Sequence, residues 1–154
     1  MKRLTVLLLS LLPLAAAAQK AKDSFDVFYR EHVGKSGYMT VEVTSDMLRL
    51  LNAGEGREEE WGTIGSIRLV TEKKPAEQFL VRIRQIVAAQ GYKLMTTVVE
   101  GDRHTAVYFK SSGNPRRSDC ITIIAGKENI VVNIVGDFDI EKLSSLSTMK
   151  FHPR

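Results

Sequence analysis

The side chains that bind metals or act as general bases are few in this chain. The three histidines are His32, His104 and His152, and no two of them stand at the spacing of a metal site. Asp137 and Asp139 lie two residues apart, but a calcium loop needs about six to eight oxygen ligands and further acidic positions. We therefore expect no metal and no cofactor, and we interpret Asp139 as a helix cap.

Nucleophilic side chains are present without the neighbours that would activate them. No serine stands in a Gly-x-Ser-x-Gly turn, and Ser66, which follows Gly65, lies inside a predicted strand. The pattern of a phosphate-binding loop is also missing. Cys120 lies in an apolar, strand-like segment and is interpreted as a small buried hydrophobe rather than a reactive thiol. The sequence therefore favours a protein without catalytic residues.

Five aromatic or basic residues are the candidates for contact with a partner. They are Trp61, Tyr108, Lys110, Arg116 and Arg117. Trp61 follows an acidic run, where a tryptophan is either a binding hot spot or an anchor for its own loop. The basic residues gather near predicted hairpin ends and would attract acidic groups. Basic and aromatic residues do not repeat across adjacent strands, so we expect no binding of nucleic acid.

The amino-terminal residues have the composition of a cleavable export signal. Lys2 and Arg3 are followed by an apolar run, and Ala16 and Ala18 fit cleavage after residue 18. The run is shorter than the roughly 20 residues that span a bilayer. We predict that the signal is removed, which lowers the net charge from +4 to +2.

The mature chain is predicted to be a single domain over residues 19–154, with a core over about 24–146. The 154 residues are 44% hydrophobic and 26% charged with one cysteine, which excludes a disulfide scaffold and a wholly disordered chain. No other segment is apolar for long enough to span a membrane, so no transmembrane segment is expected after cleavage. We expect a periplasmic protein, with secretion as the alternative.

Hydrophobic periodicity and turn residues predict ten elements. The expected helices are 24–33, 45–51, 76–90 and 140–146, and the expected strands are 38–43, 64–71, 92–99, 104–111, 119–125 and 130–136. Residues 52–62 are expected to form a loop or a frayed helix end.

The order and spacing of these elements predict the fold class. The last four strands have short connections, which force neighbours to run antiparallel. We predict an α+β fold: a mostly antiparallel sheet with a C-terminal four-strand meander and helices packed on one face. The strand at 130–136 is apolar on both faces except for Asn133 and should be central. The other sheet face is expected to carry Thr, Lys and Tyr side chains and to be wetter.

Several segments resemble a family of exported bacterial proteins, the DUF4252 domain of unknown function. The resemblance is carried by Phe28-Tyr29, by the strands at 39–43 and 64–70, by the helix at 45–51 and by residues 134–140. It covers roughly residues 24–146 and implies a signal peptide, a small α+β domain and an envelope location. These are packing patterns, so the resemblance transfers no catalytic residue.

The function expected from these features is that of a non-enzymatic envelope protein that binds a partner protein. The exposed sheet face and the 52–62 segment are the places where that contact is expected. Two alternatives stay open: a hydrolase acting on an envelope polymer, and a carrier of a small ligand, which needs a closed apolar cavity of about 300 Å³ or more. The oligomeric state is left open.

Overall fold

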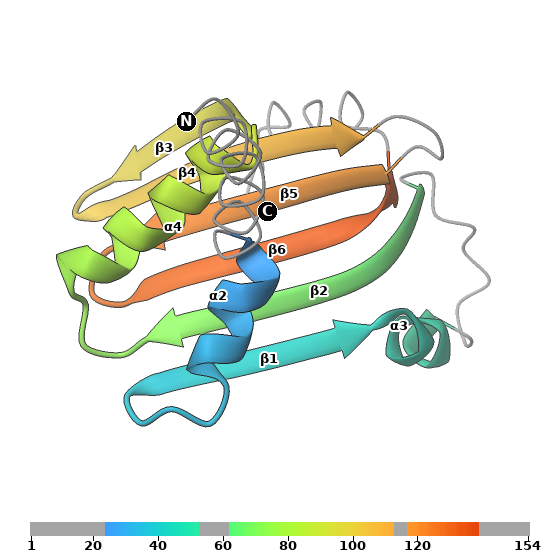
Figure 1. Cartoon of the computed structure of the whole chain (residues 1–154), viewed down its shortest axis with the longest axis horizontal. Coiled ribbons are helices and arrows are strands. Elements are labelled where there is room, and N and C mark those ends of the chain that lie inside the picture. The colour runs from blue at the N-terminus through green and yellow to red at the C-terminus, as the bar shows by residue number, and fades with distance from the viewer. Residues whose placement is uncertain (1–23, 53–61, 113–116, 139–154) are drawn as a thin grey trace, which may run out of the picture.

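A computed structural model describes residues 24–52, 62–112 and 117–138 (Figure 1). The elements are α2 (Phe25–His32), β1 (Tyr38–Thr44), α3 (Ser45–Asn52), β2 (Gly62–Glu72), α4 (Glu77–Ala89), β3 (Lys93–Glu100), β4 (Arg103–Ser112), β5 (Arg117–Ala125) and β6 (Asn129–Phe138). Each helix and strand that the sequence predicts within these ranges is present. The helix expected at 140–146 lies outside the described residues, as does most of the segment expected to be a loop.

The strands form one six-stranded sheet in the order β1-β2-β6-β5-β4-β3, in which every neighbouring pair is antiparallel. This confirms the predicted α+β class and its mostly antiparallel sheet with a C-terminal four-strand meander, since β3 to β6 are consecutive neighbours. The apolar strand β6 lies between β2 and β5, inside the sheet as expected. Strands β1 and β3 form the two edges (Figure 1).

Glycines with positive φ stand where the chain must turn sharply. Gly101, at φ 59°, lies in the two-residue turn between β3 and β4, where Glu100 pairs directly with Arg103. Gly91, at φ 74°, follows the end of α4, as the sequence predicts. These two turns fix the register of the edge hairpin and the point at which the chain leaves α4.

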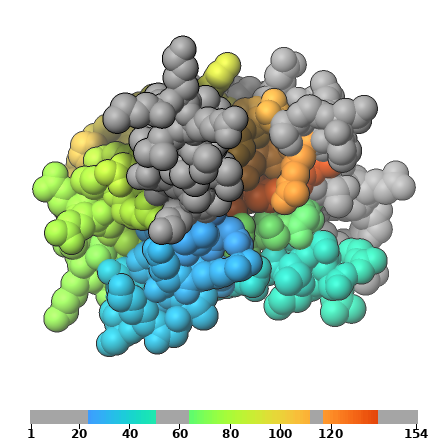
Figure 2. Space-filling model, in the orientation of Figure 1, coloured from blue at the N-terminus to red at the C-terminus, as the bar shows by residue number. Residues whose placement is uncertain are grey.

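Helices α2 and α4 lie across the same face of the sheet (Figure 1), and both stand in front of the strands in the space-filling view (Figure 2). One hydrophobic cluster joins the helices to the strands. It comprises Phe25, Phe28 and Tyr29 of α2, Phe79, Ile83, Ile86 and Val87 of α4, and Val70, Ile121, Ile123 and Val131 of the sheet. The α4 residues are the apolar stripe that the periodicity predicts for that helix.

Cross-strand register assigns every strand residue to one of two faces, because alternate side chains of a strand point to opposite sides. The row Thr40, Val70, Val131, Ile123 and Ala106 includes three core residues and therefore lies on the face under α2 and α4. We call this the covered face. The alternate residues form the opposite, uncovered face.

The expectation that Thr, Lys and Tyr side chains line the uncovered face is correct for Thr96, Thr105 and Thr122 and wrong for Tyr108 and Lys110. Tyr108 pairs with the core residue Ile121, and Lys110 pairs with Asp119, two residues along the same strand. Both side chains therefore lie on the covered face, and Tyr108 packs against the core. In strands that are apolar at both sets of alternate positions, the pattern does not reveal which set the helices bury.

Candidate functional site: the uncovered face

The uncovered face is an apolar surface that crosses all six strands. Between the strand ends, the side chains that point to this face carry no charge. They are Met39, Val41, Val43, Ile67, Leu69, Thr71, Thr96, Val98, Thr105, Val107, Phe109, Cys120, Thr122, Ile124, Ile130, Val132 and Ile134. Charged residues join this side of the register where β3 and β4 begin or end, at Lys93, Glu100 and Arg103. Neither α2 nor α4 lies over this face, since both pack on the other side, and α3 stands beyond the end of β1 (Figure 1).

The side chains of this face reach solvent most at the two edges of the sheet. Met39 and Val41 on β1 are 48% and 42% exposed, and Val98 on β3 is 48% exposed. Central residues such as Val132 and Ile134 are partly buried because their cross-strand neighbours shield their flanks. An antiparallel sheet with one face in water usually carries polar and charged residues on that face, whereas this face is mostly apolar and its polar members between the strand ends are threonines. A large, mostly apolar patch is typical of an interaction surface.

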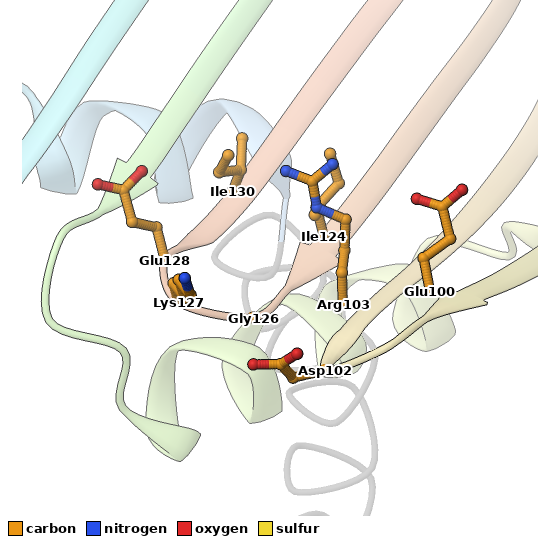
Figure 3. A pocket seen from close by; sticks show the side chains of 8 residues that line it. All are labelled: Glu100, Asp102, Arg103, Ile124, Gly126, Lys127, Glu128 and Ile130. Atoms are coloured by element: carbon orange, nitrogen blue, oxygen red, sulfur yellow. The ribbon is translucent and has the colours of Figure 1, made fainter.

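Charged residues of both signs stand at one end of the uncovered face. They line an open depression of about 500 Å³ between the β3–β4 and β5–β6 turns. The lining residues are Glu100, Asp102, Arg103, Ile124, Gly126, Lys127, Glu128 and Ile130. In Figure 3, Glu128 stands on one side, Arg103 and Glu100 stand on the other, and Ile124 and Ile130 lie between them. The apolar face thus ends in a polar rim.

On the covered face, Arg68 connects α2 to the sheet. Its Nη1 donates to Asp26 Oδ1 at 2.8 Å, and its Nη2 donates to Asn133 Oδ1 at 3.3 Å. The guanidinium carbon lies 5.2 Å from the ring centre of Phe25 and 5.5 Å from that of Tyr29, both on α2. These contacts hold the helix against β2 and β6.

The polar contacts continue from Arg68 towards β5. Asn133 is buried, and its Nδ2 donates to Asp119 Oδ1 at 2.6 Å. Burial, followed by the nearby Asp119 carboxylate, raises the pKa of Tyr92 above its ordinary value. The Lys110 ammonium lies 4.6 Å from the centre of the Tyr92 ring. Tyr92 therefore stays neutral at physiological pH, which suits a packing role better than that of a base.

A buried carboxylate fixes the start of α4. Glu72 is 5% exposed and accepts hydrogen bonds from Asn129 Nδ2 at 2.9 Å, from the Ala76 amide at 3.0 Å and from the Tyr38 hydroxyl at 3.3 Å. Ala76 is the N-cap residue and has no side chain able to cap the helix. Glu72 supplies the acceptor instead, and its negative charge suits a helix N-terminus.

Cys120 and His32 are both buried groups with local roles. Burial is the first cause that raises the pKa of the Cys120 thiol, which confirms its predicted burial and keeps it protonated at neutral pH. His32 Nδ1 donates to the Phe28 carbonyl at 2.6 Å, and its ring stands among those of Phe28, Tyr38 and Phe79. Neither arrangement activates a nucleophile.

Two of the five predicted contact residues, Trp61 and Arg116, lie outside the described residues. The other three share the covered side of the register: Tyr108 pairs with Ile121, Lys110 pairs with Asp119, and Arg117 pairs with Ser112 at the start of β5, where it is exposed. None of these three lies on the uncovered face. The basic residue Lys127 lies at the other end of β5, about 30 Å from Arg117 at roughly 3.3 Å per residue. Within the described ranges, Lys110 and Arg117 are therefore diagonal neighbours on β4 and β5, and Lys127 stands apart from them.

Residues 24–52, 62–112 and 117–138 hold no group of three His, Cys, Asp or Glu side chains placed as a metal site would require. None of the helices described has the length and apolar character needed to cross a membrane. A smaller open depression of about 240 Å³ lies at the β3–β4 edge beside Arg84 of α4. Its volume falls below the roughly 300 Å³ that a ligand cavity starts from.

Comparison with known proteins places this fold in a family. The family described as Domain of unknown function (DUF4252) matches residues 29–146. The chain belongs to this family. The matched residues run from α2 to beyond β6, so the DUF4252 region includes every strand of the sheet and both of its faces. No curated protein and no solved structure matches the chain.

The uncovered face is a site that the sequence alone does not identify. Its signal is the apolar character of both sets of alternate positions in β6, apart from Asn133. That pattern indicates burial on both sides of a sheet, but it does not reveal that α2 and α4 both pack on the same side.

Proposed function

We propose that this protein is an exported, non-enzymatic protein of the cell envelope that acts by binding another protein chain through the uncovered face of its sheet. The observation that carries the proposal is the absence of charge from that face between the strand ends, across all six strands. The centre of a protein interface has fewer charged side chains than the rest of a protein surface.

Two further observations support the proposal. The basic start, apolar run and small residues of the first 18 residues have the pattern of a cleavable signal. Three titratable side chains within the fold are tied into structural contacts: Glu72 holds α4, and Arg68 and Asp119 belong to the contacts that hold α2 and β6. Packing accounts for their roles, which favours a binding module over an enzyme.

The test uses a thiol placed on the uncovered face. Val132→Cys in a Cys120→Ser background is labelled with a short photoreactive cross-linker in the envelope fraction of producing cells. The matched control is Gln85→Cys in the same background, since Gln85 is exposed on α4 on the other side of the sheet. We expect protein adducts from Val132→Cys and not from Gln85→Cys, and amino-terminal sequencing of the protein should begin at Gln19.

The proposal fails if the two positions give the same adducts or if neither gives any. Recovery of the protein in the cytosol with residues 1–18 still attached would contradict the proposed role in the cell envelope.

A further inference from the structure

We infer that the chain which covers the uncovered face is a second copy of this protein, so that two sheets pack face to face in a symmetric dimer. The inference rests on the proposed function, because it names the binding partner of the same face. Three properties of the face point to a second copy: its area, its shape and the charges at its end.

The area of the face matches what a stable dimer needs. Six strands about 4.8 Å apart, with about seven residues each at about 3.4 Å, span roughly 600 Å². Two such faces would together remove about 1,200 Å² from solvent, which is at the lower end of the range for specific interfaces. The face is therefore large enough for a homodimer without help from other elements.

The shape of the face suits another sheet. Two twisted sheets pack about 10 Å apart when their inner faces carry interdigitating apolar side chains. The inner strands of this face carry apolar side chains of different sizes, from Val107 and Val132 to Phe109, which can interdigitate with those of a second sheet.

The charges at the end of the face suit a partner with the same charges. The rim depression carries Glu100, Asp102 and Glu128 together with Arg103 and Lys127. A symmetric interface uses the same patch on both subunits, so a rim of mixed sign can pair with its own copy. A rim directed at an acidic or a basic partner would instead carry one sign.

Sedimentation equilibrium of the purified protein tests the inference. We expect a dimer at micromolar concentration. Val132→Lys should weaken it by at least about 100-fold, because it puts two like charges at the centre of a desolvated patch. Gln85→Lys on α4 should leave the dimer unchanged. Val98→Lys at the sheet edge should weaken it less, by about 10-fold, because an edge charge stays partly in water.

Far-ultraviolet circular dichroism and a urea unfolding curve are measured for each variant, so that loss of the dimer is not mistaken for loss of the fold. A wild-type protein that stays monomeric up to about 100 μM would overturn the inference, as would a dimer that Val132→Lys leaves intact.

The cross-linking experiment separates this failure from that of the proposed function. An adduct of twice the chain mass from Val132→Cys supports the dimer. An adduct with a different protein overturns the dimer and leaves the binding function standing. Absence of any adduct would contradict both the dimer and the proposed binding function.

Discussion

The two faces of the sheet differ in polarity, and buried polar residues lie under the helices while the face away from α2 and α4 is mostly apolar. The covered face, which α2 and α4 shield, carries Arg68, Glu72, Asp119 and Asn133, whereas the uncovered face carries no charge between its strand ends. On the covered face, each of these polar residues has hydrogen-bond partners: Arg68 binds Asp26 of α2, Glu72 binds the Ala76 amide at the start of α4, and Asn133 binds Asp119. On the uncovered face, the side chains between the strand ends are uncharged, and neither α2 nor α4 lies over them.

The largest expected loss of stability is found by comparing two isoleucines, one on each face of the sheet. Ile121→Ala removes a fully buried side chain under the helices and should lower the free energy of unfolding by about 2–5 kcal/mol. Ile134→Ala, on the uncovered face, should cost less than about 1.5 kcal/mol in dilute solution, because its side chain is only partly buried. Urea unfolding monitored by circular dichroism measures both.

The difference between the two isoleucines also depends on protein concentration. If the uncovered face is a dimer interface, the loss from Ile134→Ala grows as concentration rises, whereas the loss from Ile121→Ala does not. Equal losses from the two variants in dilute solution would show that the faces are equally buried in the monomer.

A smaller effect is expected where the covered face is polar. Asn133→Ala deletes the acceptor of Arg68 Nη2 and the donor to Asp119, so two partly buried charged groups each lose a hydrogen bond. We expect a loss of about 1–3 kcal/mol in the free energy of unfolding. Thr105→Ala, a polar truncation on the uncovered face, is the control and should cost less than about 1 kcal/mol. A similar cost for the two variants would contradict the assignment of the polar contacts to one face.

The smallest effect concerns pH and Tyr92. Its pKa is raised in the folded protein, so above about pH 10, where the unfolded chain loses the phenol proton, the folded state binds more protons. The free energy of unfolding should therefore fall as pH rises, by no more than about 1.4 kcal/mol per pH unit for one proton. Tyr92→Phe should reduce this slope in urea unfolding series at about pH 9 to 11.

The slope should not vanish in that variant, because burial also raises the pKa values of Cys120 and Tyr38. A wild-type protein whose stability is unchanged between about pH 9 and 11 would show that Tyr92 titrates as freely as in the unfolded chain.

Much of the fold could be predicted from the sequence because local signals agreed with one another. The stripe Phe79, Ile83, Ile86 and Val87 has helical spacing and is followed by Gly91, and α4 forms there. Short connections after residue 92 fix the antiparallel meander without any knowledge of distant contacts. The apolar run around Val132 placed β6 inside the sheet for the same local reason.

The candidate site could not be predicted in the same way, because a face is a property of register between distant strands. Lys110 stands beside Phe109 in the sequence, yet the two side chains lie on opposite faces. Pairing with Cys120 and Asp119 of β5 decides which side each takes, and a shift of one residue would exchange them. The partners of Arg68, on α2 and β6, are likewise set by tertiary contacts that local spacing does not encode.

The strand order has a consequence for how the chain folds. β6, the last strand in the described sequence, joins the β1–β2 pair to the β3–β5 strands, which share no ladder with that pair. The hydrogen-bonded sheet is therefore complete only when the last described strand has been made, whereas α2 and α4 come earlier in the chain and pack against each other through Phe28 and Phe79.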